Sequence, residues 1–229
     1  MPGDDGRPVI ERTIEAATHG RYLISPGDGP RAALLIGFHG YGETAEEELS
    51  RLRSIPGIDH WTVVSIQGLH QFYRRRTNEV VGSWMTRQNR ELAIADNIAY
   101  ASNVIRQITS ECAVNPTLVM TGFSQGVAMA FRAAVALDRP IAGIISCGGD
   151  VPPELEATRL ARIPAALIGR GVSDDWYTAE KLAADQNRLQ AAGVALQTVV
   201  LDAAHEWTVE FSALCARFLE SSLARHSAL

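Results

Sequence analysis

Apolar runs of strand length alternate with helical patterns along most of the chain, and this alternation restricts the possible folds more than any other feature. The run RAALLIGFHG is apolar without interruption, which is typical of a strand buried on both faces. Further strands are predicted in WTVVSIQG, PTLVMTG, IAGIISCG, PAALIGR and VALQTVVL. Strands that alternate with helices predict crossover connections, and therefore an α/β fold with a mainly parallel sheet and helices on both faces.

The helices are predicted from apolar spacing and from end signals. Over residues 90–112 apolar side chains recur at steps of three and four, which places them on one helical face. Residues 44–47 have the form of a capping box, and residues 178–193 carry start and stop signals for a further helix. A last helix follows the final strand.

Two segments depart from the alternation. VIERTIEAA and GRYLISP, at residues 9–17 and 20–26, are predicted to form an N-terminal antiparallel hairpin at one edge of the sheet. Residues 70–84 show no period and are predicted to be a loop. Without repeats or a long linker, residues 1–229 are expected to form a single domain with no separate cap domain.

Composition and charge argue against several classes of protein. The 229 residues carry a net charge of -5, whereas binding to nucleic acid phosphates needs a basic excess. The one dense basic run, Arg74-Arg75-Arg76, is interpreted as a solvated loop, with a clamp for an acidic substrate group as the alternative. No run approaches the ~20 apolar residues of a membrane span. Three separated cysteines and an acidic N-terminus favour a reducing, cytoplasmic location; the protein could be a monomer or a homodimer.

The sequence MTGFSQGVAM contains the pattern G-x-S-x-G between a predicted strand and a predicted helix. A strand that turns at once into a helix strains its middle residue, and Gly122 and Gly126 avoid a clash of Cβ atoms around Ser124. The turn also places Ser124 at a helix N-terminus, where the N–H of Gln125 would face an oxyanion. The context therefore predicts Ser124 as a nucleophile.

A serine nucleophile needs a base and an acid that orients the base. Of the two histidines after Ser124, His205 follows the last strand, whereas His226 is three residues from the C-terminus. The expected chain order of serine, acid and histidine favours an acid between them. The candidates are Asp150, Asp174, Asp175 and Asp202. From the residues alone, the choice between Asp174 and Asp175 stays open.

The loop FHGYGET offers the second oxyanion donor. An N–H from such a loop completes the oxyanion site in lipase-type hydrolases, and Tyr41 follows the His-Gly pair. His39 is interpreted as a structural histidine that braces this loop. No His/Cys/Asp cluster has metal-ligand spacing, and no dinucleotide or phosphate loop is present, so neither a metal nor a cofactor is expected.

On these motifs the chain resembles the phospholipase/carboxylesterase family of α/β hydrolases, which includes acyl-protein thioesterases. FHGYGET, GSWM, TGFSQG, GVSDDWYTAEK and AAHEW occur in that order between about Ala32 and Leu219. The resemblance implies the α/β-hydrolase fold and selects Asp174 as the acid, because the family's acid lies three positions after a glycine, here Gly171. The other implied site residues are Ser124 and His205, with the N–H groups of Tyr41 and Gln125 as oxyanion donors.

Two tryptophans are candidates for binding the substrate. In the family a tryptophan lies near the acyl groove, which implies that Trp84 lines it; Trp176 is a second candidate pocket residue. Val127 replaces a glycine that the family has after the elbow. The sequence therefore predicts a serine hydrolase that acts on a small-molecule ester or thioester through an acyl-enzyme. The alternatives are a serine peptidase on the same scaffold and a non-catalytic binding module.

Overall fold

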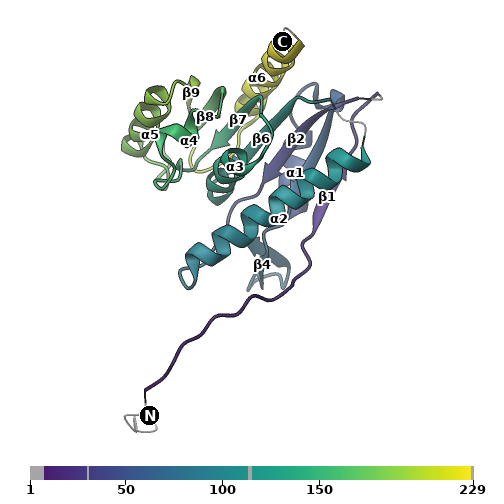
Figure 1. Ribbon diagram of the computed structural model, residues 1–229. Coiled ribbons are helices and arrows are strands. Elements are labelled where there is room, and N and C mark those ends of the chain that lie inside the picture. The colour runs from purple at the N-terminus through teal and green to yellow at the C-terminus, as the bar shows by residue number, and fades with distance from the viewer. Residues whose placement is uncertain (1–7, 30, 113–114, 228–229) are drawn as a thin grey trace.

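The computed structural model describes residues 8–29, 31–112 and 115–227 (Figure 1). Its main sheet has seven strands in the order β1-β3-β2-β6-β7-β8-β9. These strands are β1 (Tyr22–Ser25), β2 (Ala33–Phe38), β3 (Trp61–Ile66), β6 (Leu118–Phe123), β7 (Gly143–Cys147), β8 (Ala165–Gly171) and β9 (Ala195–Leu201). All neighbouring pairs are parallel except β1 with β3, so the predicted α/β class with a mainly parallel sheet is confirmed.

Helices cover both faces of this sheet. They are α1 (Ala45–Arg53), α2 (Arg90–Glu111), α3 (Gln125–Ala136), α4 (Ala157–Leu160), α5 (Ala179–Ala191) and α6 (Val209–Ser227), with a short 3-10 helix η1 (Ile58–His60) before β3. Helix α1 begins with the predicted capping box of Thr44 and Glu47. None of the helices in the described part of the chain is both long and apolar enough to cross a membrane.

The strands alternate their side chains between two core layers. In β2, Leu34, Ile36 and Phe38 belong to the core layer that also contains residues of α2, α3 and α5, whereas Ala33 and Leu35 belong to the layer with residues of α1 and α6. Figure 1 shows α2 and α3 in front of the sheet and α6 behind it. Side chains on both faces of β2 are therefore buried, which explains why the run RAALLIGFHG does not alternate between apolar and polar residues.

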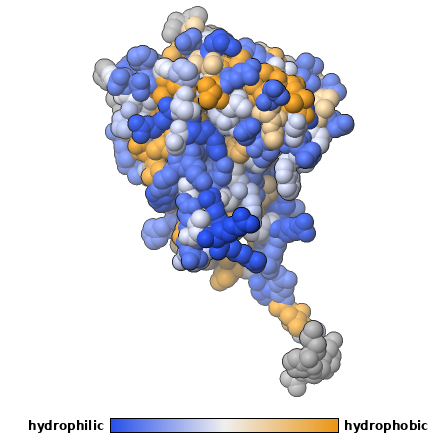
Figure 2. Space-filling model, turned by 180° about the vertical axis from the view of Figure 1, so that it is seen from behind, coloured by the Kyte–Doolittle hydropathy of each residue, from blue (hydrophilic) through white to orange (hydrophobic). Residues whose placement is uncertain are grey.

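The N-terminal edge of the sheet differs from the prediction. Strand β1 is antiparallel as expected, but its partner is β3, with Tyr22 opposite Ile66. Residues 9–17 form no strand, so the predicted hairpin is wrong in its first half. Val9 and Ile14 are 96% and 93% exposed, since no core face lies next to this segment. The segment projects from the body in both whole-molecule views (Figures 1 and 2).

The segment predicted as a loop at residues 70–84 forms a second, two-stranded sheet. Strands β4 (His70–Tyr73) and β5 (Val80–Ser83) pair in antiparallel fashion. Each strand has only four residues, and β4 is exposed over most of its length, so neither gives a clear apolar period. Arg74 follows β4 and pairs with Glu47 and Glu79, which makes it a brace for this hairpin.

Candidate active site

The backbone at Ser124 has an unusual conformation, with φ of 52° and ψ of -120°. Strand β6 ends at Phe123 and α3 begins at Gln125, so Ser124 alone makes the turn. A Cβ atom at Gly122 would lie 2.5 Å from the carbonyl carbon of Gly126, and one at Gly126 would lie 1.9 Å from the Phe38 carbonyl oxygen. Both positions therefore require glycine, and the turn holds Ser124 in a strained conformation.

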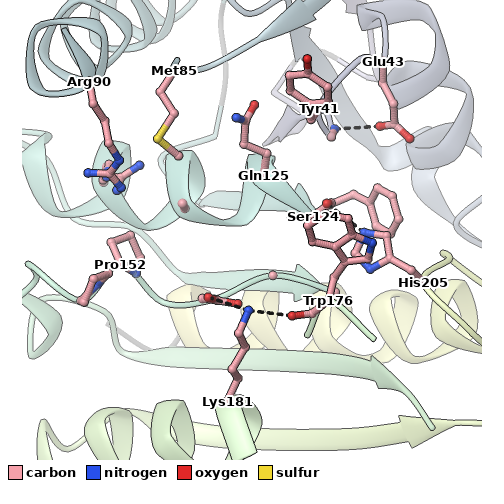
Figure 3. Close-up of a pocket in the computed structure, with 18 residues that line it drawn as sticks. Tyr41, Glu43, Met85, Arg90, Ser124, Gln125, Pro152, Trp176, Lys181 and His205 are labelled. Carbon is pink, nitrogen blue, oxygen red and sulfur yellow. Dashed lines mark hydrogen bonds and ion pairs between the residues drawn. The ribbon is translucent and has the colours of Figure 1, made fainter. Parts of the chain in front are cut away.

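Ser124, His205 and Asp174 meet at the carboxyl ends of the parallel strands. Ser124 Oγ lies 2.8 Å from His205 Nε2, and His205 Nδ1 lies 2.8 Å from Asp174 Oδ2. Ser124 follows β6, Asp174 follows β8 and His205 follows β9. Figure 3 shows Ser124 beside His205 at one end of a pocket. A hydroxyl, an imidazole and a carboxylate thus form one continuous hydrogen-bonded line.

The Asp174 carboxylate is buried and well supplied with donors. Its Oδ1 accepts hydrogen bonds from the backbone N–H groups of Trp176 and Tyr177, at 2.8 and 2.9 Å. Burial alone would raise the pKa of Asp174, but the N–H of Tyr177, the His205 ring and the N–H of Trp176 outweigh it and lower this pKa. Asp174 is therefore an anion that holds the Nδ1–H tautomer of His205.

The other acid candidates lie in different surroundings. Asp175 and Asp202 are exposed. Asp150 borders the pocket but forms an ion pair with Lys181 at 3.3 Å. Asp174 is the candidate that the structure brings to the His205 ring.

The backbone of the loop after β2 lies beside Ser124. Tyr41 and Gln125 both border the pocket, and neither of their N–H groups has a hydrogen-bond acceptor among residues 8–29, 31–112 and 115–227. The loop is held by Glu43, whose Oε2 accepts the Gly40 N–H at 2.7 Å. The Tyr41 ring packs on Phe72 of β4, with ring centroids 5.3 Å apart. Two backbone donors therefore border the same pocket as the Ser124 hydroxyl.

His39 braces this loop, as the sequence predicts. Its side chain is fully buried, and Nε2 accepts the Gly68 N–H at 2.9 Å. Nδ1 must then carry the proton that is donated to the Gly40 carbonyl oxygen at 2.7 Å. Burial lowers the pKa of His39. A neutral ring with both nitrogens engaged is a structural group.

A buried charge cluster behind the loop was not found from the sequence. The Arg51 guanidinium donates to both oxygens of Glu43, contacts Glu48, and lies 4.5 Å from the centroid of the Phe123 ring. Burial raises the pKa of Glu48, and the positive charge of Arg51 lowers it by a smaller amount. The cluster fastens α1 to the Gly40 loop and to the end of β6. No local pattern in the sequence indicates it, because the packing of distant segments creates it.

Trp84 does not lie where the resemblance implied. The side chain is fully buried, does not line the pocket, and donates from Nε1 to the His39 carbonyl oxygen at 2.8 Å. Its backbone N–H donates to Gln125 Oε1 at 3.0 Å, and Ser83 Oγ donates to the same atom at 3.2 Å. The expected groove residue is therefore a core residue, and the next residue, Met85, borders the pocket instead.

The pocket has a volume of about 730 Å³ and opens beside Ser124. Trp176 lines it and is 75% exposed, which agrees with its expected position at the site. Val127 is buried in the core and is not among the residues that line the pocket. Two lining residues were missed from the sequence, Arg90 and Arg132. The spacing of Ser124, Ala128 and Arg132 at four-residue steps along one helix was the available signal for Arg132.

Within the described residues, no group of three or more His, Cys, Asp or Glu side chains could hold a metal ion. The chemistry that the arrangement supports comes from the side chains themselves. A hydrogen-bonded hydroxyl with an adjacent imidazole and two free N–H groups suits attack on a carbonyl carbon and stabilisation of the resulting oxyanion.

Comparisons with known proteins agree with this fold. No curated protein sequence matches the chain. Similar solved structures include a carboxylesterase from Mesorhizobium loti (17% identity, TM-score 0.73, 88% of this chain and 94% of that one). Acyl-protein thioesterase 2 from Zea mays is also similar (18% identity, TM-score 0.67, 90% and 100%), as is esterase PE8 (19%, 0.71, 89% and 99%).

At these identities the structural likeness shows the α/β-hydrolase fold. The sequence itself matches the profile of the phospholipase/carboxylesterase family over residues 19–222, most of the chain. Together with the strand order and the turn at Ser124, this match shows that the chain belongs to the phospholipase/carboxylesterase family of α/β hydrolases and is a hydrolase of the carboxylesterase type.

Proposed function

We propose that this chain is a serine hydrolase that cleaves small-molecule carboxylic esters or thioesters through Ser124, His205 and Asp174. The observation that carries the proposal is the pair of 2.8 Å contacts that joins the three side chains, of which Ser124 and His205 line the pocket. Residues 1–229 would act as one catalytic domain without a separate cap domain.

The mechanism begins with proton transfer. His205 Nε2 takes the proton of Ser124 as Oγ attacks the carbonyl carbon, and a tetrahedral intermediate forms. Asp174 keeps Nδ1–H in place and stabilises the imidazolium. The intermediate collapses when the alcohol or thiol leaves with the proton from Nε2, which gives an acyl-enzyme on Ser124. Water then attacks in the same way, the acid is released, and Ser124 regains its proton.

Stabilisation of the oxyanion is the largest contribution that this site offers. The N–H groups of Gln125 and Tyr41 would point at the oxygen as it gains charge, at roughly 3–4 kcal/mol per donor. Gln125 is also the first residue of α3, and the positive end of the helix dipole favours the same charge.

Labelling with a fluorophosphonate tests this proposal directly. We expect the wild-type chain to gain one adduct at Ser124 by intact mass, Ser124→Ala to gain none, and Ser50→Ala, which alters an exposed serine of α1, to behave as wild type. A series of p-nitrophenyl esters from acetate to palmitate, with one thioester, then identifies the acyl preference.

The alternatives give different results in these assays once a peptide amide, matched to one of the esters, is added to the substrates. A folded wild-type chain that stays unlabelled and turns over no ester would support a non-catalytic binding module. Preferred cleavage of a peptide amide over the matched ester would support a peptidase.

All three cysteines are free, which supports a reducing compartment, and we place the activity in the cytoplasm as part of the proposal.

A further inference from the structure

The pocket runs along one face of α3, away from Ser124. Ser124, Ala128 and Arg132 follow each other at four-residue steps and all line it. Eight residues of helix correspond to about 12 Å along the axis. Figure 3 shows Arg90 and Pro152 at the end of the pocket opposite Ser124. The reacting hydroxyl and the arginines therefore mark the two ends of one cavity.

Arg132 is buried and only partly satisfied. Its side chain is 2% exposed, and both Nε and Nη2 contact the same oxygen of Glu154, at 2.7 and 2.6 Å. Nη1 is also buried but has no hydrogen-bond partner among the residues that the structure describes. A guanidinium stays protonated in proteins, and an unpaired buried donor is unfavourable. Arg132 also borders the pocket, so an acceptor that reaches the guanidinium from this end of the cavity would satisfy Nη1.

The charges at this end are unbalanced. The Arg90 guanidinium also lines the pocket, and its charge acts on Arg132, while Glu154 supplies one carboxylate for the pair. Lys181 does not add to the excess, because it is paired with Asp150. Apolar side chains also border this pocket, among them Met85, Ala128 and Pro153.

We propose that Arg132 and Arg90 form a subsite for an anionic group of the substrate, a carboxylate or a phosphate that an apolar spacer joins to the scissile carbonyl. Arginine donors in a fixed fork suit both anions. The inference rests on the proposed function and narrows its substrate class. The separation of Ser124 and Arg132 along the axis of α3 is about 12 Å, which sets the order of length of the spacer.

Two substrate series test the subsite and separate the two possible positions of the anion. Mono-p-nitrophenyl esters of linear diacids, from adipate to dodecanedioate, place a carboxylate on the acyl side, and the matched terminal carboxamides are the neutral controls. Acetate esters of ω-hydroxyalkyl phosphates, with diol monoacetates as controls, place the anion on the leaving group. For one series we expect kcat/KM to favour the anion by about 10- to 100-fold at the best spacer length.

Two variants of Arg132 and one of Glu154 should change this preference for the anion, and a variant of Arg106 is the control. Arg132→Gln should remove most of the preference, and Arg132→Lys should restore part of it. Glu154→Gln removes the competing carboxylate and should increase the preference. Arg106→Gln, which loses an exposed arginine of α2 outside the pocket, should leave the preference unchanged.

Arg90→Gln offers a second test at an exposed position if Arg132→Gln does not fold; it should lower the preference for the anion. The inference is overturned if neither series favours the anion, or if Arg132→Gln slows anionic and neutral esters equally. It is also overturned if Glu154→Gln lowers the preference. If Ser124 is still labelled and neutral esters are still hydrolysed, the proposed hydrolase function stands although the anion subsite is overturned. If the chain is neither labelled nor hydrolyses any ester, the hydrolase function and the anion subsite are both overturned.

Discussion

Replacement of Asp174 by asparagine separates orientation of the histidine from folding. The new side chain would keep an oxygen for the N–H groups of Trp176 and Tyr177, which now donate to Asp174 Oδ1. Those two bonds would turn the amide NH2 toward His205 Nδ1, which must then accept a hydrogen bond. The ring proton would move to Nε2, and Nε2 could no longer take the proton of Ser124.

The expected loss in kcat is about 10³- to 10⁴-fold, which corresponds to roughly 4–5.5 kcal/mol of transition-state stabilisation. The assay is p-nitrophenyl acetate hydrolysis, with circular dichroism to confirm the fold. Asp175→Asn is the matched control, since this neighbour is exposed, and it should keep most of the activity. A larger loss in Asp175→Asn than in Asp174→Asn, or a loss below about tenfold in Asp174→Asn, would refute the reasoning.

The remaining predictions concern packing and pH. Gly126→Ala would bring a Cβ to 1.9 Å from the Phe38 carbonyl oxygen, and we expect a loss of at least about 2 kcal/mol in urea unfolding. Trp84→Phe should cost about 2–4 kcal/mol without changing KM, because the ring is fully buried outside the pocket. Trp176→Ala should raise KM and lower the stability by less than about 1 kcal/mol, because the ring is exposed. Equal losses of stability in the Trp84 and Trp176 variants would contradict both predictions. The lowered pKa of Asp174 contributes stability that is present above the unfolded pKa, near 4, and lost as pH falls through the folded value. Asp174→Asn should therefore flatten the acid limb of the stability profile.

The parts of this molecule that depend on local pattern could be predicted from the sequence. The turn at Ser124 is one, because its glycines, strand and helix lie within a few residues. The meeting of Ser124 with His205 followed from the rule that parallel strands end at one edge of the sheet. The choice of Asp174 over its neighbour needed the family resemblance, since one position decides which carboxylate faces the core.

The errors have a common physical cause. Residues 9–17 have strand-forming residues, but Tyr22–Ser25 alone pairs with β3 at that side of the sheet, and residues 9–17 do not add to it. Trp84 has the residue type of a groove wall, but its depth depends on how the β4–β5 hairpin packs over His39. The Arg132 guanidinium has its partner 22 positions away, in Glu154. Tertiary packing decides each of these contacts; local periodicity shows at most which helix face a residue such as Arg132 occupies, and not its partner.

The contacts of Gln125 have a consequence for protein engineering. Any amino acid except proline could supply the backbone N–H at this position, but the side chain amide also fastens Ser83 and Trp84 to the start of α3. A saturation library at position 125 would therefore select first for variants that keep the hairpin docked, and only second for turnover. A screen that measures activity alone would not distinguish variants that lose the contact between the hairpin and α3 from variants that lose a catalytic group.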